Sequence, residues 1–380
     1  LSPEDIAGHR VLALLYTLRD QKEKALSEYM RILELDPEQY DVLLSIGSHY
    51  KQKGEFKEAL KFYEQYAEQF PDDLKSFTVV GDLYRTLGDY EQAKSYYEKA
   101  LLIEPEKLSV LRTLAGIEST LGNFQEAEKM YQDVLEISKI PQDKISTYSA
   151  LAAFYETKGQ VRKSLEYVDL YLTESAKVQP PFFVLLNRIE FMDRYIKVGQ
   201  EQIAIDTVKE FEAQAKSPFD KMVPLVYLAL YVELEDAEKA EKEIEGVEMF
   251  MQTFQLEMFR SGVFEAKGNI DELKGDYEKA ILNYRKTLEL TPTDTMINKE
   301  IGRSYGKMKK FKEAEEHLQK VLKKFPFDPE VHYEIAVVYW DWGKKDRALE
   351  HLKIALDVWK DADPEYKPAI KAREKFEEWK

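Results

Sequence analysis

Histidine is the residue in this chain whose chemistry is easiest to recognise from sequence, because it titrates near neutral pH and often binds metal ions. The sequence contains five histidines but no His-Glu-x-x-His motif, which would place two metal ligands on one helix face. They are scattered over five different expected helices, as His9, His49, His317, His332 and His351. The sequence therefore predicts no metal site.

Other catalytic chemistry is equally poorly supported by the sequence. The chain contains no cysteine, which excludes disulfides, thiolate catalysis and cysteine-based zinc or iron–sulfur sites. It also lacks the Gly-rich phosphate loops of the Walker and dinucleotide-binding types. Nearly all of its carboxylates are expected on solvated helix faces. We therefore expect no cofactor and no enzymatic activity.

The composition is that of a folded, strongly acidic chain. Hydrophobic residues make up 44% of the 380 residues, which is enough to bury a core. The net charge of −16, from 55 basic and 71 acidic residues, disfavours nucleic acid and anionic membranes as partners. The longest apolar run, 222–232, is 11 residues long and too short to span a bilayer. A cytoplasmic location is expected, or a periplasmic one if a signal peptide has been removed.

The elements that would position binding residues repeat every 34 residues. The repeating positions are Pro37, Pro71 and Pro105, then Ala25, Ala59, Ala93 and Ala127, then Tyr29, Tyr63, Tyr97 and Tyr131. Within a repeat, apolar residues recur every three or four positions, which predicts two amphipathic helices. In residues 74–107, Gly88 separates the two helices and Pro105 follows the second. Each pair must stack on its neighbours to bury its apolar surfaces.

This pattern resembles the tetratricopeptide repeat family, whose signature combines L-G-x-x-Y, G-x-Y/F, A-x-x-x-F/Y and a closing proline. Good matches are Ile46-Gly47-x-x-Tyr50, Val80-Gly81-x-x-Tyr84 and Ile301-Gly302-x-x-Tyr305. The resemblance covers nearly the whole chain. It implies an all-α fold, a right-handed superhelical solenoid of stacked antiparallel helix pairs.

Ten repeats are expected, followed by a C-terminal capping helix. Repeats one to five occupy residues 1–178, and repeats six and seven, at 179–254, keep the helical period but lose most signature residues. Repeats eight to ten occupy 255–362, and an amphipathic helix over 363–380 provides the polar-faced cap that a solenoid needs. The first helix of repeat eight is expected to be lengthened, from about Leu256 towards Lys274.

The resemblance also implies where partners bind, because in this family the first helix of each repeat lines a concave inner surface. Three groups of residues project onto that surface. They are a basic pocket of Lys51, Lys75, Arg85 and Arg112, an apolar groove of Leu186, Ile189, Ile196, Met222, Leu225 and Val232, and a C-terminal groove of Lys299, Arg303, Tyr333 and Trp340.

The first two groups each have a competing interpretation. The basic pocket suits a carboxylate-rich peptide, unless Asp41 and Asp82 simply neutralise it. The apolar groove suits an amphipathic partner helix or a second copy of the chain, giving a homodimer. Alternatively, the solenoid tightens there and the apolar residues pack on one another.

The function predicted from these features is that of a non-catalytic scaffold, which binds a peptide or partner helix of another protein in its concave groove. Two alternatives are a sensor or regulatory arm of a larger bacterial kinase or cyclase, and a periplasmic assembly factor. The first Leu1, in place of a methionine, indicates a fragment or a processed form.

Overall fold

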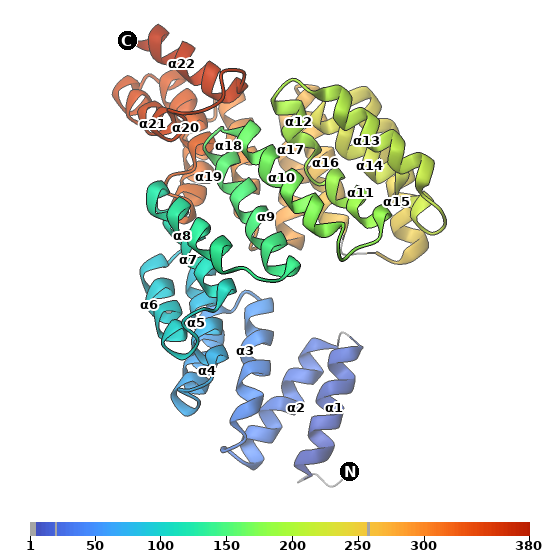
Figure 1. The fold of residues 1–380 in the computed structure, drawn as a ribbon, viewed down its shortest axis with the longest axis vertical. Coiled ribbons are helices and arrows are strands. Elements are labelled where there is room, and N and C mark those ends of the chain that lie inside the picture. Colours follow the sequence, from blue (N-terminus) through green and yellow to red (C-terminus); the bar gives the residue numbers. More distant parts are fainter. Residues whose placement is uncertain (1–4, 20, 257–258) are drawn as a thin grey trace. The chain divides into compact units, whose positions relative to one another are not determined.

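The structure, a computed structural model, describes residues 5–19, 21–256 and 259–380. All regular secondary structure in these residues is helical (Figure 1). The chain divides into two compact units, Leu1–Leu114 and Ala115–Lys380, with the boundary inside helix α7. Ten helix pairs follow one another in the described residues, and a single helix ends the chain. The predicted all-α architecture of antiparallel pairs with a C-terminal cap is confirmed.

The first unit contains three complete helix pairs and the first half of α7. Its helices are α1 (Ile6–Leu18), α2 (Lys22–Leu35), the 3₁₀ turn η1 (Tyr40–Val42), α3 (Leu43–Gln52), α4 (Phe56–Gln69), α5 (Leu74–Leu87), α6 (Tyr90–Ile103) and α7 (Leu108–Thr120).

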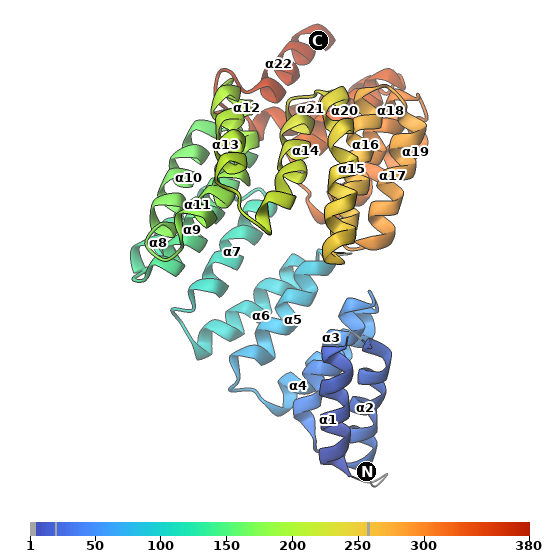
Figure 2. The same cartoon turned by 90° about the vertical axis from the view of Figure 1, so that its right-hand side faces the viewer.

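The second unit begins at Ala115, in the middle of α7, and contains the irregular repeats. Its first helices are α8 (Phe124–Ile137), α9 (Pro141–Thr157), α10 (Val161–Ser175), α11 (Pro181–Ile189), α12 (Met192–Lys197) and α13 (Glu201–Gln214). A 3₁₀ turn, η2 (Phe219–Met222), leads into α14 (Val223–Glu233), α15 (Ala237–Phe254), α16 (Arg260–Leu273) and α17 (Tyr277–Leu290), which Figure 2 shows stacked side by side. The last are α18 (Ile297–Lys307), α19 (Phe311–Lys324), α20 (Pro329–Asp341), α21 (Lys345–Val358) and α22 (Lys367–Trp379).

Small residues at the repeating positions let the paired helices approach each other. Ala59 and Ala93 are completely buried, and Tyr97 is 2% exposed. A Cβ atom on Gly81 would lie 3.0 Å from the Tyr97 ring, so a larger residue there would push α5 away from α6. Gly88, between these helices, has φ +80°, the left-handed conformation that glycine adopts without a Cβ penalty. The 34-residue pattern is therefore a packing pattern.

Repeats six to eight differ from the prediction. The first helix of repeat six is split into α11 and α12, because the chain leaves the helical conformation at Phe191 (φ −109°, ψ 12°) and buries that ring. The lengthened helix is the 18-residue α15 of repeat seven, which continues until Gln255 turns left-handed at φ +55°. In repeat eight, α16 has 14 residues and begins at Arg260; part of the expected extension falls on 257–258, outside the described residues.

The capping helix α22 starts at Lys367, four residues later than the expected start at Asp363. The segment before it makes a turn and contacts the loop between α9 and α10. The Asp363 amide donates a hydrogen bond to the Gly159 carbonyl at 3.0 Å, and the Arg162 amide donates to the Asp363 carboxylate at 2.8 Å. Arg162 and Asp363 are 201 residues apart in sequence. The second unit therefore closes on itself, and we call this contact the closure contact.

Candidate functional site

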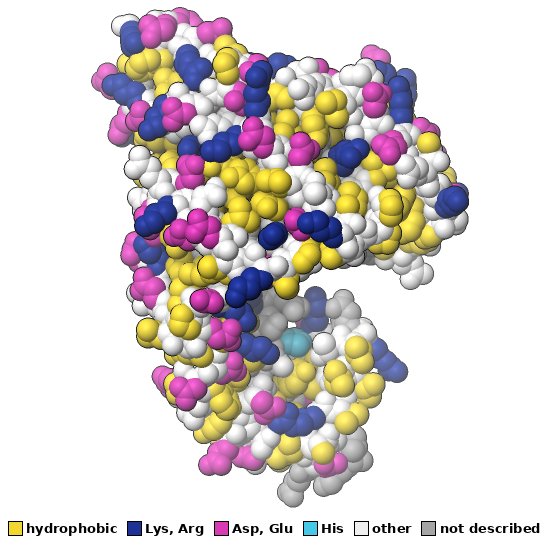
Figure 3. Space-filling model, viewed as in Figure 1, with side chains coloured by type: hydrophobic (Ala, Val, Ile, Leu, Met, Phe, Trp, Pro, Cys, Tyr) yellow, Lys and Arg dark blue, Asp and Glu magenta, His cyan; other side chains and the backbone are white. Residues whose placement is uncertain are grey.

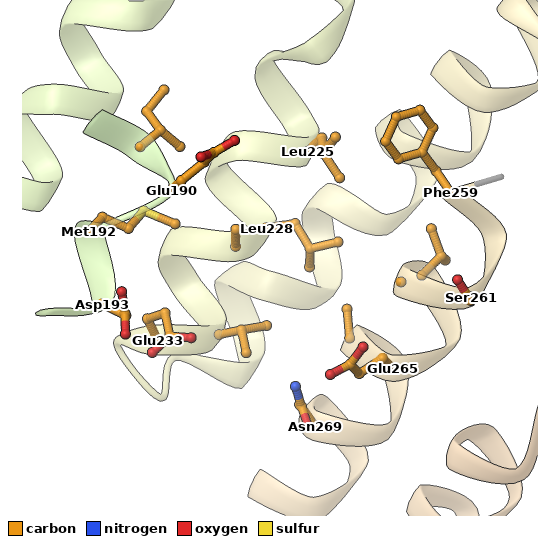
Figure 4. Close-up of a pocket in the computed structure, with 16 residues that line it drawn as sticks. Glu190, Met192, Asp193, Leu225, Leu228, Glu233, Phe259, Ser261, Glu265 and Asn269 are labelled. Carbon is orange, nitrogen blue, oxygen red and sulfur yellow. The ribbon is translucent and has the colours of Figure 1, made fainter. Parts of the chain in front are cut away.

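An apolar cavity lies between α11, α14 and α16 of three successive repeats, and we call it the α11–α16 pocket. Its volume is about 570 Å³, which falls within the usual range for ligand pockets. Ile189, Leu225 and Val232 line it from α11 and α14. Val263 and Ala266 line it from α16. Side chains from all three helices point into the space between them (Figure 4).

Most of the predicted apolar groove is found in or beside this pocket. Leu186 and Met222 lie outside its lining and pack with Ile189 on the core formed by α11, α13 and α14. Ile196 lies instead in a second cavity, described below. The predicted alternative, in which the apolar residues pack on one another, therefore describes Leu186 and Met222. The wall supplied by α16 was missed, because no inner residues were assigned to the expected first helix of repeat eight.

Four carboxylates also line the α11–α16 pocket: Glu190, Asp193, Glu233 and Glu265. The Asp193 carboxylate accepts a hydrogen bond from Lys197 at 2.8 Å, and this pair holds the pKa of Asp193 below its ordinary value against the effect of burial. Burial raises the pKa of Glu233, and the nearby Asp193 carboxylate raises it further. Burial is also the main cause of the raised pKa of Glu265.

A second cavity, of about 390 Å³, contains three of the four residues predicted for the C-terminal groove. Lys299, Arg303 and Tyr333 line it, together with Lys367 and Lys371 of the capping helix. Trp340 is placed elsewhere: its ring stacks on Trp379 of α22 with the centroids 4.4 Å apart. Trp340 therefore anchors the cap.

The predicted cations of this second cavity are bound by carboxylates of the chain itself. The Lys299 ammonium lies 2.6 Å from the Glu330 carboxylate, and Arg303 donates to both oxygens of Glu272 at 2.6 and 2.9 Å. The Lys299 charge, against the effect of burial, lowers the pKa of Glu330 to about 2. Burial raises the pKa of Glu334, although Arg303 opposes that shift. The cavity is thus built from internal ion pairs with balanced charge.

The four residues of the predicted basic pocket come from the first helices of three neighbouring repeats. Lys51 lies on α3, Lys75 and Arg85 on α5, and Arg112 on α7. The Arg85 guanidinium is 49% exposed and lies 3.6 Å from Asp82. Its pKa is raised because hydrogen bonding to Tyr97 and the charge of Asp82 outweigh burial. Asp41 instead pairs with Arg10, so only Asp82 acts as the predicted neutralising partner.

Two of the histidines meet, which the sequence did not indicate. The Nδ1 atoms of His332 and His351 lie 2.8 Å apart, and the other His332 nitrogen lies 2.9 Å from the Pro326 carbonyl. His332 is 3% exposed. Burial lowers the pKa of both histidines, to about 4 for His351. No group of three or more potential metal ligands occurs in the part of the chain that the structure describes.

On the face of the molecule shown in Figure 3, basic and acidic side chains are interspersed. None of the helices in the described ranges is long and apolar enough to cross a membrane. The helix pairs that follow one another through the described residues define the class of helical repeat proteins.

Sequence models of the tetratricopeptide repeat match residues 38–103, 78–140 and 299–367. The chain is a tetratricopeptide repeat protein. The similarity of family and fold says nothing about the partner, because this fold hosts many functions.

Solved structures of the same family are similar to the chain, and no curated protein sequence matches it. A tetratricopeptide repeat protein from Parabacteroides merdae is 14% identical over 78% of this chain and 97% of its own, with a TM-score of 0.49. The TPR domain of P58(IPK) is 15% identical over 89% and 98%, with a TM-score of 0.28. The Thermus thermophilus protein TTC0263 is 19% identical over 50% and 100%, with a TM-score of 0.39. Because these TM-scores are below 0.5, the family assignment depends on the sequence models and the repeated helix pairs.

Proposed function

We propose that this chain is a non-catalytic scaffold that holds another protein by binding one of its segments in the α11–α16 pocket. Tetratricopeptide repeat proteins generally mediate protein–protein interactions. The observation that carries the proposal is the pocket itself, an apolar space of about 570 Å³ between helices of three successive repeats. Contiguous apolar side chains around an open space typically mark an interface.

The size and lining of the pocket support a peptide segment as its occupant. Leu225 and Val232 are one and a half to two turns apart on α14, so they form an apolar strip along the helix rather than a single point. Ala229, between them, is exposed and lines the pocket. A segment lying along α14 would therefore contact all three side chains. The residues of the basic pocket, on α3, α5 and α7, are proposed as a second contact for an acidic part of the partner.

Affinity capture with the full chain tests this proposal. The wild-type chain, Leu225→Glu and Ile189→Glu are compared as baits, and the captured proteins are quantified by mass spectrometry. Leu282→Glu is the matched control, because Leu282 is 55% exposed on α17 and lies outside the pocket lining. We expect a partner that is lost with both pocket variants and kept with the control.

Folding of every bait is checked by circular dichroism before capture. Retention of all partners by folded Leu225→Glu and Ile189→Glu would refute the proposal. If both variants instead unfold while Leu282→Glu folds, the two residues belong to the core, and the pocket is not an open interface.

A further inference from the structure

All the charged side chains that line the α11–α16 pocket are acidic. Its lining includes Glu190, Asp193, Glu233 and Glu265 but no lysine, arginine or histidine. The second cavity of the same unit differs, since it is lined by lysines and an arginine as well as by glutamates. An apolar pocket with only negative charges around it is complementary to a ligand that combines apolar and positively charged groups.

Asp193 is the only one of these carboxylates that forms a direct ion pair among the described residues. Lys197 lies 2.8 Å from Asp193 and 2.5 Å from Glu156, so its ammonium is shared between two carboxylates. Within the described ranges, neither an ion pair nor a side-chain hydrogen bond is formed by Glu190, Glu233 or Glu265. Three of the four carboxylates therefore form no direct ion pair within the described residues, although Lys197 lies near Glu233 and Lys299 lies near Glu265.

Glu233 is exposed and Glu265 is half-buried, and the charged groups that act on each are mostly carboxylates. Burial raises the pKa of each. The carboxylates of Asp193, Glu156 and Glu330 raise the pKa of Glu233 further and Lys197 opposes them, whereas Asp294 and Glu300 raise the pKa of Glu265 and Lys299 opposes them. A lysine or arginine brought into the pocket would relieve this unfavourable environment. Interactions of this kind are stronger in a partly enclosed site than on an open surface.

The positions of the apolar and acidic groups fit an amphipathic ligand. In Figure 4, Leu225, Phe259 and Glu190 lie towards one end of the pocket, and Glu233, Glu265 and Asn269 lie towards the other. Leu228 lies between these two groups in the same view. A helix or extended segment along the pocket would therefore contact apolar side chains along α14 and a carboxylate at either end, Glu190 at one and Glu233 with Glu265 at the other.

We propose that the partner segment bound by the α11–α16 pocket is cationic and amphipathic, with a lysine or arginine beside the apolar side chains that enter the pocket. This inference rests on the proposed function and specifies the chemistry of its partner. The apolar side chains would contact Leu225, Val232 and Val263, and the cation would lie between Glu233 and Glu265.

Two synthetic peptides test the inference directly on the full chain. Both are 18 residues long and carry the same leucine face, but one has lysines and the other has glutamates at all the polar positions. Binding is measured by fluorescence anisotropy of a labelled peptide. We expect the lysine peptide to bind and the glutamate peptide not to bind.

Protein variants locate the interaction. The double variant Glu233→Gln, Glu265→Gln is expected to weaken binding of the lysine peptide by about tenfold. The matched double control Glu238→Gln, Glu245→Gln removes two exposed carboxylates of α15 and should leave affinity unchanged. Leu225→Glu should abolish binding through loss of the apolar contact. Affinity for the lysine peptide should also rise with pH as Glu233 and Glu265 ionise.

Equal binding of both peptides, or no difference between the two double variants, would overturn the inference. If binding is still lost with Leu225→Glu in that case, the pocket remains an apolar binding site and the proposed function stands. Failure of both peptides to bind also overturns the inference, while affinity capture tests the proposed function separately. Concentration-dependent self-association of the wild-type chain that Leu225→Glu abolishes would show a second copy of the chain as the occupant, contrary to the inference.

Discussion

Gly159→Ala is predicted to disrupt the closure contact of the second unit. Gly159 has φ +69°, and a Cβ atom there would lie 2.7 Å from the Tyr366 ring and 2.8 Å from the Ala362 methyl. Tyr366 is 1% exposed and packs on Trp359 with the ring centroids 5.8 Å apart, so its ring has no free space in which to move. The alanine methyl therefore either strains the α9–α10 turn or displaces the segment before α22.

The expected loss of stability in Gly159→Ala has two parts. A residue with a Cβ atom in the left-handed conformation costs about 1–2 kcal/mol relative to glycine. Forcing a methyl group into a well-packed contact costs roughly 1–3 kcal/mol more. Gly275→Ala separates the two parts, because Gly275 has φ +78° but no atom within 4 Å of the added Cβ. Both variants bear the conformational cost, and only Gly159→Ala bears the steric one.

Amide hydrogen exchange at Asp363 is the suitable assay, since this amide donates to the Gly159 carbonyl across the contact. A loss of roughly 1–3 kcal/mol in local stability corresponds to exchange about 5- to 150-fold faster. We expect that increase in Gly159→Ala and little change at Asp363 in Gly275→Ala. In a Tyr366→Ala background, the extra effect of Gly159→Ala should decrease, because the contact with the ring is removed and only the contact with the Ala362 methyl remains. Equal exchange at Asp363 in the two glycine variants would refute the steric argument.

Four further predictions concern stability and binding. Chelator and reductant should leave the melting temperature unchanged, because the chain has no cysteine and no metal-ligand cluster in its described part; a decrease with chelator would contradict this. Lys299→Met should cost roughly 1–3 kcal/mol in a urea titration, less than for a fully buried pair because Glu330 is partly exposed; an unchanged midpoint would argue against the ion pair. His317 and His351 each have a pKa lowered to about 4, mainly by burial, so the unfolded chain binds more protons between pH 4 and 6.5; stability should fall as pH decreases through this range, and a flat profile would count against burial. Replacing Arg85 and Arg112 by alanine should weaken partner binding and its salt dependence without changing helicity, whereas unchanged affinity would exclude the basic pocket.

The regular repeats could be predicted from sequence because their packing residues are small or aromatic at fixed positions. Gly81 beneath Tyr97 is an example, since only one pairing of α5 and α6 lets the ring lie over the glycine. Local spacing along the chain therefore determines the structure of each helix pair and of its contact with the next one. The split of the first helix of repeat six was not predictable in this way, because the break at Phe191 follows from burial of that ring against Tyr171 of the preceding repeat.

Part of the α11–α16 pocket could be predicted for the same reason, because the helical period shows which residues lie at inner positions. Ile189, Leu225 and Val232 were identified because they lie at inner positions of helices whose period could be read from the sequence. The closure contact could not be inferred, since it joins residues 201 positions apart and depends on the accumulated geometry of several repeats. The stacking of Trp340 on Trp379 was missed for a related reason, because the position of the capping helix had to be known first.

Photo-crosslinking from position 229 tests the central claim most directly. Ala229 is exposed and lines the α11–α16 pocket between Leu225 and Val232, so replacing it with a photoreactive phenylalanine places the probe inside the proposed site. The same probe at Leu282, on α17, is the control. We predict a cross-linked partner from position 229 whose attached peptide contains apolar residues beside a lysine or arginine, and no such product from position 282. Cross-links from position 229 that reach only residues of this chain, or an equal yield of the same partner from both positions, would contradict the claim that the pocket holds a segment of another protein.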